Sequence, residues 1–211
     1  RSIDAEGVVM RGYYFITDTG LSLAGNLSDV RAAAAAGVTV VQYRNKSNIT
    51  RDMYEEALLL KSACGGKAKF IINDRIDIAL AVDADGVHVG QEDMPYDRAR
   101  HLLGPDKIIG VTVHDLDEAL EAEARGADYL GLSPIFATGT KDDAGAPCGT
   151  AVIAELKKHC RVPVVAIGGI GLSNVDEVVA AGADMVCAIS AVVTKPDVVA
   201  AILEFQRRYE S

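Results

Sequence analysis

The same two-part segment occurs eight times along this chain, and this repetition strongly limits the folds that the chain can adopt. Each copy has a short apolar run of β-forming residues, then a polar break, then an Ala- and Leu-rich stretch with helical spacing. This alternation predicts a parallel sheet covered by helices. The predicted strands are 13–17, 38–44, 69–73, 86–90, 108–113, 129–133, 163–168 and 185–190. The predicted helices are 28–36, 50–64, 76–82, 96–103, 115–125, 149–159, 174–181 and 196–209.

Eight units favour a closed barrel over an open doubly wound sheet. An open sheet usually has about five or six units and a glycine-rich dinucleotide fingerprint after its first strand. Residues 17–20 (TDTG) form no such fingerprint. We therefore predict an α/β fold, a single-domain (β/α)8 TIM barrel over residues 1–211, with 1–11 as an N-terminal extension. Four helix-to-strand junctions carry a glycine that we expect to supply a left-handed helix cap, at 36–38, 83–87, 126–129 and 181–185.

Composition excludes several classes of partner. The formal net charge of −9 argues against nucleic acid and against an anionic membrane surface, and no apolar run reaches the ~18 residues of a membrane span. The four cysteines form neither a CxxC pair nor a zinc spacing with histidine, so we expect reduced thiols and a cytoplasmic protein. Barrel helices often pair through exposed faces, which leaves a homo-oligomer open.

Charged side chains collect where three neighbouring strands are predicted to end. In such a barrel the active site lies at the C-terminal ends of the strands. The second strand carries Arg44 and Lys46 on the face that it shares with Gln42, and such cations suit phosphate oxygens. The next two strands end at Asp74 and near Asp93, and paired carboxylates suit Mg²⁺. Taken singly, the cations could be a solvated strand end and each acid could cap the following helix.

Other predicted strand ends add polar groups. Thr112 and His114 share a face of the fifth strand, and His88 lies on the fourth. Either histidine could act as a general base, although a lone histidine at a strand end is more often structural. The long polar segment 133–145 is predicted to be a mobile substrate loop that can wrap an anion with Thr138, Thr140 and Lys141.

The last two strands predict a second anion site. Loops after strands seven and eight commonly bind phosphate in these barrels. Gly168 and Gly169 follow the seventh strand and would let backbone N–H groups approach an anion, while the eighth strand ends at Ser190. The rim is therefore predicted to hold a metal-assisted anion site and a backbone-lined one. Two phosphorylated substrates, or one long bisphosphate, would fill them.

Ordered motifs along almost the whole chain resemble the thiamine phosphate synthase family. Each fragment alone is weak, but the combination in this order is specific. The motifs are 42–46 (QYRNK), 72–75 (INDR), 86–93 (GVHVGQED), 110–114 (GVTVH), 134–141 (PIFATGTK) and 166–170 (AIGGI). The usual serine of the fifth-strand motif is Thr112 here, and residues 144–149 (AGAPCG) also depart from the family pattern.

The resemblance implies a transferase that joins 4-amino-2-methyl-5-pyrimidinylmethyl diphosphate to hydroxyethylthiazole phosphate, releasing pyrophosphate and requiring Mg²⁺. By motif, Asp74 and Asp93 would hold the metal, and Arg44, Thr112 and Lys141 would act in catalysis. The pyrimidine diphosphate would be bound by Gln42, Tyr43, Arg44, Asn45, Lys46, Asn73, Thr112 and Lys141. The thiazole phosphate would be bound by Thr138, Gly139, Thr140, Gly169, Ile189 and Ser190.

Two other functions fit parts of the pattern. A thiazole tautomerase would share the thiazole-phosphate pocket but needs a proton-transfer residue, and residues 133–136 (SPIF) lack the histidine of such relatives. A non-catalytic phosphometabolite-binding barrel could keep Gly169 and Ser190, yet it would have no use for paired carboxylates. The retained cations and acids favour the synthase.

Overall fold

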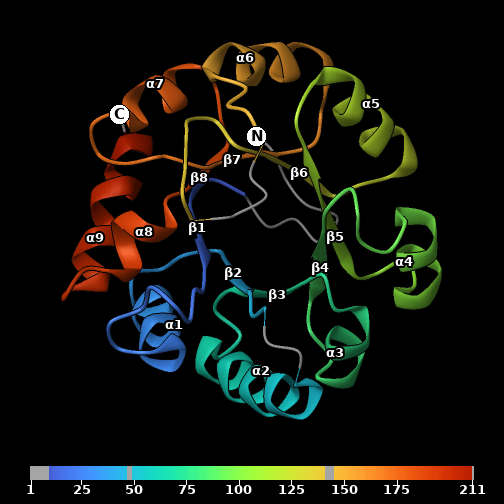
Figure 1. Ribbon diagram of the computed structural model, residues 1–211, viewed down its shortest axis with the longest axis vertical. Helices are drawn as coiled ribbons and strands as arrows, with labels where there is room; N and C mark the ends of the chain where they lie inside the picture. The colour runs from blue at the N-terminus through green and yellow to red at the C-terminus, as the bar shows by residue number, and fades with distance from the viewer. Residues whose placement is uncertain (1–9, 47–48, 141–144, 211) are drawn as a thin grey trace.

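Eight parallel strands close into a barrel in chain order, and the helices form a ring around it (Figure 1). The computed structural model describes residues 10–46, 49–140 and 145–210, so positions 1–9 of the predicted N-terminal extension lie outside the described residues. The (β/α)8 prediction is confirmed, and β8 pairs with β1 to complete the barrel. The strands are β1 Gly12–Ile16, β2 Val40–Tyr43, β3 Lys69–Asn73, β4 Gly86–Val89, β5 Ile108–Val113, β6 Tyr129–Leu132, β7 Val164–Ile167 and β8 Met185–Cys187.

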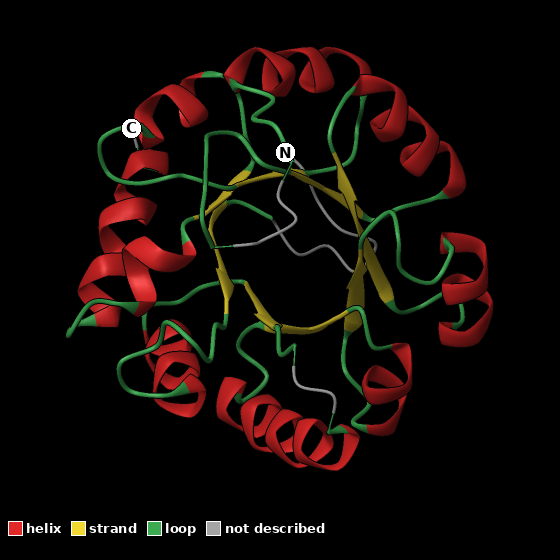
Figure 2. Ribbon diagram, in the orientation of Figure 1, coloured by secondary structure: helices red, strands yellow, loops and turns green. Residues whose placement is uncertain are grey.

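The helices lie outside the strands, as Figure 2 shows by colour. Within the described residues no helix combines the length and apolarity that a membrane span needs. The elements are α1 Asn26–Ala35, α2 Thr50–Cys64, α3 Ile76–Ala81, α4 Tyr96–Leu103, α5 Leu116–Arg125, α6 Thr150–His159, α7 Val175–Ala180, α8 Ile189–Val193, α9 Val198–Gln206 and the 3₁₀ turn η1 Arg207–Tyr209.

The eighth strand is shorter than predicted, because a helix that the sequence pattern did not indicate follows it. We expected a strand through residue 190, but β8 ends at Cys187 and α8 begins at Ile189. The run 185–193 (MVCAISAVV) is apolar throughout, and periodicity alone cannot divide such a run between strand and helix. As a consequence, Ile189 and Ser190 reach the rim from the first turn of a helix.

The strands are buried along nearly their whole length, because the barrel interior covers one face and the helices cover the other. Three of the four predicted left-handed caps are confirmed by positive φ angles at Gly37, Gly126 and Gly182. At the fourth junction the left-handed residue is Asp83, with φ of 53°. Glycine is needed at position 86 for a steric reason instead, because a Cβ atom there would lie 2.0 Å from the Ile108 carbonyl oxygen.

Candidate active site

The C-terminal ends of β2 to β6 surround a polar cavity of about 430 Å³. The side chains that the sequence placed at these strand ends therefore meet in one space. The lining residues are Arg44, Lys46, Asn73, Asp74, His88, Gly90, Gln91, Glu92, Asp93, Thr112, His114 and Ser133. We call this space the diphosphate cavity.

A narrower pocket adjoins it beyond β6. Ser133 lines both spaces, so the two are neighbours across the end of that strand. This second space, which we call the rim pocket, is lined by Ser133, Thr138, Thr140, Ile167, Gly168, Gly169, Ile170, Cys187, Ala188, Ile189 and Ser190. Residues predicted for each of the two anion sites line these two spaces, and anion binding itself stays a prediction.

Asp74 and Asp93 face one another in the diphosphate cavity. Burial opposes ionisation of Asp74, but hydrogen bonds from Lys46 and from Asp93 outweigh it and lower the pKa of Asp74. Burial and the adjacent Asp74 carboxyl together raise the pKa of Asp93, although the Gly90 N–H donates to Asp93 Oδ2 at 2.7 Å. In this adjacent pair, Asp74 is therefore the carboxyl group that ionises more readily.

The backbone presents Asp74 to the cavity rather than to a helix. Asp74 has a φ of 62°, a left-handed conformation that aspartate tolerates better than most residues. Its N–H donates to the His88 carbonyl oxygen at 2.8 Å, which ties it to β4. The side chain makes no N-terminal cap on α3, so the alternative capping role does not apply.

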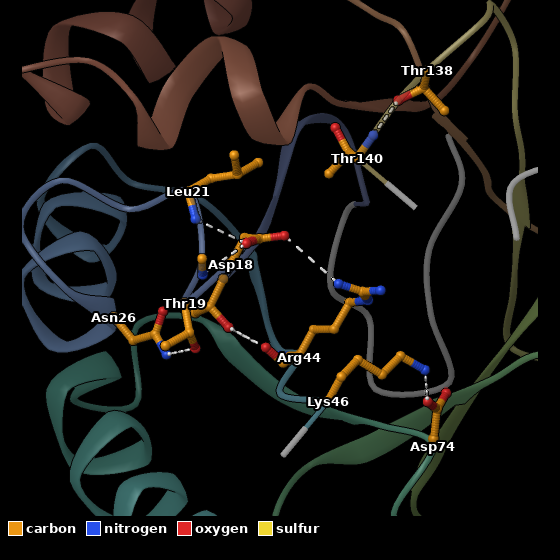
Figure 3. A network of polar contacts seen from close by, with 11 residues as sticks. Asp18, Thr19, Leu21, Asn26, Arg44, Lys46, Asp74, Thr138 and Thr140 are labelled. Carbon is orange, nitrogen blue, oxygen red and sulfur yellow. Dashed lines mark hydrogen bonds and ion pairs between the residues drawn. The ribbon is translucent and has the colours of Figure 1, made fainter. Parts of the chain in front are cut away.

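Arg44 is held in place from the loop after β1. Its Nη1 lies 3.6 Å from Asp18 Oδ2, and both side chains are nearly buried, at 13% and 12% exposed. Asp18 Oδ1 in turn accepts hydrogen bonds from the Gly20 and Leu21 N–H groups, each at 3.1 Å. The Arg44 backbone is fixed as well, because its N–H donates to Thr17 Oγ1 at 3.0 Å. Figure 3 shows the guanidinium beside Asp18, joined to it by this ion pair.

One nitrogen of the Arg44 guanidinium is available to a ligand. Its Nε is buried and has no hydrogen-bond partner among the described residues. A buried donor without a partner is costly, and a phosphate oxygen would satisfy it. Lys46 Nζ lies 2.7 Å from Asp74 Oδ2 and its side chain is 59% exposed, so this cation can turn toward a ligand (Figure 3). Arg44 with Asp18, and Lys46 with Asp74 and Asp93, therefore form two charged groups beside the same cavity.

The rim pocket offers backbone donors instead of charged side chains. Gly169 has a φ of 65°, and its carbonyl oxygen accepts a hydrogen bond from Asn174 Nδ2 at 3.0 Å. Thr140 N–H donates to Thr138 Oγ1 at 3.2 Å, which folds this part of the loop back on itself (Figure 3). The first N–H groups of α8 have no partner within the helix, and they lie beside Gly169 in the pocket wall.

A Gly169→Ala variant is expected to close the rim pocket. A Cβ atom at this position would lie 2.5 Å from the Ala137 carbonyl oxygen, in addition to the strain of the positive φ. The peptide must therefore move, and we expect the KM for the phosphate that occupies this pocket to rise about tenfold or more. Steady-state kinetics with a Gly171→Ala control measures this, because a Cβ atom at Gly171 meets nothing within 4 Å. Equal KM values for the two variants would contradict this assignment of the pocket.

Two side chains of the 42–46 motif turn away from the diphosphate cavity. Tyr43 OH donates to Glu56 Oε2 at 2.5 Å, and Asn45 Nδ2 donates to Tyr43 OH at 2.9 Å. Strand alternation explains this, since residues 43 and 45 lie on the opposite face from Arg44. These side chains support the strand end from outside, and direct substrate contact by either remains a prediction. Gln42 is buried within the barrel below the cavity.

The remaining predicted residues divide into four groups. Asn73 and Thr112 line the diphosphate cavity as expected. Gly139 belongs to the described loop but lines neither space. Lys141 lies outside the described residues, so its assignment stays a prediction. His88 is buried and hydrogen-bonded. His114 is exposed and pairs with Glu118 at 2.8 Å. Both observations agree with a structural role, which the sequence left open for each histidine.

The sequence reading missed Asp18 and Ser133. Asp18 follows the first predicted strand directly, in the 17–20 segment that was tested only against a dinucleotide fingerprint. Its position at the end of β1 was the available signal, because every strand end contributes to the rim of this fold. Ser133 ends the sixth predicted strand and could have been found in the same way.

The fold and the two adjoining spaces define a (β/α)8 barrel whose rim is suited to phosphorylated small molecules. A family model described as thiamine monophosphate synthase matches residues 13–192. The chain belongs to the thiamine monophosphate synthase family, whose enzymes are transferases of thiamine biosynthesis.

Individual relatives agree with this placement. A thiamine-phosphate synthase of Methanosarcina barkeri is 56% identical over 186 residues, which cover 88% of this chain and 84% of that protein. One of Chloroflexus aurantiacus is 52% identical, over 89% of this chain and 88% of that protein. The solved structure of a thiamine phosphate pyrophosphorylase from Pyrococcus furiosus superimposes with a TM-score of 0.87 at 41% identity, over 96% of each chain.

Proposed function

We propose that this chain catalyses the Mg²⁺-dependent condensation of 4-amino-2-methyl-5-pyrimidinylmethyl diphosphate with hydroxyethylthiazole phosphate. The products are thiamine phosphate and pyrophosphate. The observation that carries this proposal is the pairing of Asp74 with Asp93 beside Arg44 and Lys46, in a cavity that adjoins a second anion pocket. One space suits a diphosphate with its metal, and the other suits a monophosphate.

The two carboxylates fit a magnesium ion. Mg²⁺ is usually held by one or two carboxylates, with waters and substrate phosphates completing its six ligands. Among the described residues no group of three or more His, Cys, Asp or Glu side chains could hold a metal ion. Asp74 and Asp93 would hold the ion, and it would neutralise charge on the departing pyrophosphate.

The side chains of this protein then bind and orient the diphosphate. Arg44 can donate two parallel hydrogen bonds to phosphate oxygens, and Lys46 supplies a mobile point charge. Asn73 and Thr112 add neutral donors at the cavity wall. Negative charge grows on the leaving oxygen as the C–O bond breaks, so these donors stabilise the transition state more than the ground state.

The other half of the reaction needs no general base. The ring nitrogen of the thiazole attacks as a neutral lone pair, forms the C–N bond and releases no proton. The rim pocket would hold the thiazole phosphate through Gly169, Ser190 and Thr138 so that this nitrogen faces the methylene carbon. Rate enhancement would then come from positioning and charge stabilisation.

A direct assay tests the proposal. We expect pyrophosphate release only when the protein, Mg²⁺ and both substrates are mixed, and no release without the thiazole phosphate. Interconversion of a thiazole phosphate alone, without pyrophosphate, would instead indicate the tautomerase. Binding of either phosphate without turnover would indicate the non-catalytic barrel.

Thr112→Ser is expected to have a mild effect, with kcat/KM within about threefold of the parent, because the hydroxyl is retained and only a methyl group is lost. Thr112→Val keeps the shape and removes the hydroxyl, so we expect a loss of about tenfold. Steady-state kinetics with varied pyrimidine diphosphate compares the two variants. Equal activity of the serine and valine variants would remove Thr112 from the proposed donor set.

The cellular setting is part of the same proposal. A cytoplasmic location is supported by Cys64, Cys148, Cys160 and Cys187, all of which are free thiols. Small phosphorylated substrates are the expected partners, and homo-oligomer formation stays a prediction.

A further inference from the structure

Five polar side chains form one continuous set of hydrogen bonds through the barrel interior, and the set ends at the diphosphate cavity. Gln42 Nε2 donates to Tyr14 OH at 2.9 Å, and Tyr14 OH lies 2.7 Å from Tyr129 OH. Tyr129 OH lies 3.0 Å from His88 Nδ1, and His88 Nε2 lies 2.8 Å from Thr112 Oγ1. We call these five residues the buried relay. Its members come from β2, β1, β6, β4 and β5, so it crosses the barrel.

The barrel makes specific room for the two rings at the centre of the relay. A Cβ atom at Gly110 would lie 2.0 Å from Tyr129 Cζ, and one at Gly131 would lie 2.8 Å from His88 Cε1. Barrel interiors of this kind are usually filled by branched apolar residues, and glycine weakens a strand. Gly110 and Gly131 therefore leave the space that the Tyr129 and His88 rings occupy. An apolar core would need neither these glycines nor the buried polar side chains.

The donor and the acceptor in each hydrogen bond of the relay follow from counting the available protons. Tyr14 and Tyr129 are both buried, and burial raises the pKa of each phenol, so each keeps one proton at neutral pH. Tyr14 OH already accepts from the Gln42 amide and so donates its own proton to Tyr129. Tyr129 then donates to His88 Nδ1, which leaves the ring proton on Nε2 as the donor to Thr112.

The Thr112 hydroxyl, at the end of the relay, keeps a proton that it can donate. Thr112 Oγ1 accepts from His88, so its own O–H can donate into the diphosphate cavity, which both residues line. With the opposite amide orientation of Gln42, every hydrogen bond would reverse and Thr112 would present only an acceptor. A cavity for an anion needs the donor, so the orientation shown is the one that matches the proposed substrate.

We propose that Tyr14 and Tyr129 are positioning residues that hold His88 as its Nε2–H tautomer and so present the Thr112 hydroxyl as a donor to the pyrimidine diphosphate. This inference rests on the proposed function for the identity of the substrate. The tautomer itself is a property of the protein without substrate.

Replacing Tyr129 by phenylalanine removes one hydroxyl and keeps the ring that fills the space beside Gly110. His88 Nδ1 then loses its donor, and both ring tautomers become available. We expect kcat/KM for the pyrimidine diphosphate to fall about tenfold, with KM for the thiazole phosphate within about twofold. Tyr96→Phe is the matched control, because Tyr96 is also buried and donates to a backbone oxygen, that of Gly126, outside the barrel interior. It should leave both constants within about twofold.

The tautomer is read by ¹⁵N NMR of histidine-labelled protein without substrate, with the His88 signals assigned from a His88→Gln variant. The parent protein should show a protonated Nε2 and an unprotonated Nδ1. Tyr129→Phe should show a mixture of the two forms, whereas a hydroxyl that acts only through packing would leave the signature unchanged. If Tyr129→Phe does not fold, Tyr14→Phe replaces it. It removes the proton that Tyr14 donates to Tyr129, which frees the Tyr129 oxygen to accept from His88 Nδ1, so it should also give a mixture.

Three results would overturn the inference: a protonated Nδ1 in the parent, an unchanged His88 signature in both tyrosine variants, or parental kcat/KM in Tyr129→Phe. The NMR result does not depend on turnover. If the parent protein releases no pyrophosphate, the proposed function fails, while the direction of the relay is still decided by the His88 signals.

Discussion

Asp74→Asn is expected to lower kcat for pyrophosphate release by roughly two to three orders of magnitude, because it removes a charge that faces the leaving group at the metal site. Asparagine is preferred to alanine here, since it tolerates the left-handed backbone that Asp74 adopts with φ of 62°. Asp93→Asn should act in the same direction and should raise the Mg²⁺ concentration needed for half-maximal rate. Titration of Mg²⁺ in a pyrophosphate-release assay measures both effects.

Stability separates this loss from misfolding. The Lys46–Asp74 pair is partly exposed and worth at most about 1 kcal/mol. We therefore expect the thermal midpoint of either variant in metal-free buffer to stay close to that of the parent. Asp97→Asn is a suitable control, because Asp97 is an exposed acid on the adjacent helix α4, with its side chain 71% exposed. A parental rate for both Asp74→Asn and Asp93→Asn at limiting Mg²⁺ would refute the metal assignment.

Arg44→Lys is expected to lower kcat/KM for the pyrimidine diphosphate by roughly one to two orders of magnitude, although the charge is kept. The guanidinium is held by Asp18, and its buried Nε has no partner among the described residues. A lysine at this position can supply neither the second parallel hydrogen bond nor the contact with Asp18 in the same geometry. The KM for the thiazole phosphate should change little, because that substrate would occupy the rim pocket.

The control for Arg44 is Arg125→Lys, which makes the same change on α5 at a side chain that is 43% exposed. Asp18→Asn gives a second, independent check. It weakens the support of Arg44 without touching the cavity directly, and we expect a smaller loss of about three- to tenfold. Arg44→Lys with parental kcat/KM would show that the diphosphate is bound elsewhere.

Most of the barrel could be predicted from sequence because its strands and helices differ clearly in period and composition. Strands such as β3, predicted as 69–73 and observed as Lys69–Asn73, are bounded by a turn on one side and a polar residue on the other. The helix α8 could not be predicted, because the apolar run 185–193 contains no polar break between strand and helix. Ser190 therefore lies on the rim, as predicted, but in a helix instead of a strand.

Cavity residues could be predicted where a charged side chain stands at or near the end of a predicted strand, as at Asp74, Asp93 and Arg44. It was not predictable where the contact joins distant positions. Tyr14 and Tyr129 are 115 residues apart and look like ordinary strand aromatics, yet their hydroxyls meet inside the barrel. The 42–46 motif shows the converse, since Tyr43 and Asn45 flank the cavity residue Arg44 in sequence but face Glu56 on the other side of the strand.

The most direct test of the account is to locate a divalent cation in crystals grown with Mn²⁺ and pyrophosphate, using the anomalous signal of manganese. We predict one peak between Asp74 and Asp93, roughly 2.2 Å from a carboxylate oxygen of each, with pyrophosphate oxygens completing its coordination and Arg44 bound to the same pyrophosphate. A manganese peak that touches neither aspartate, with pyrophosphate bound away from Arg44, would contradict it.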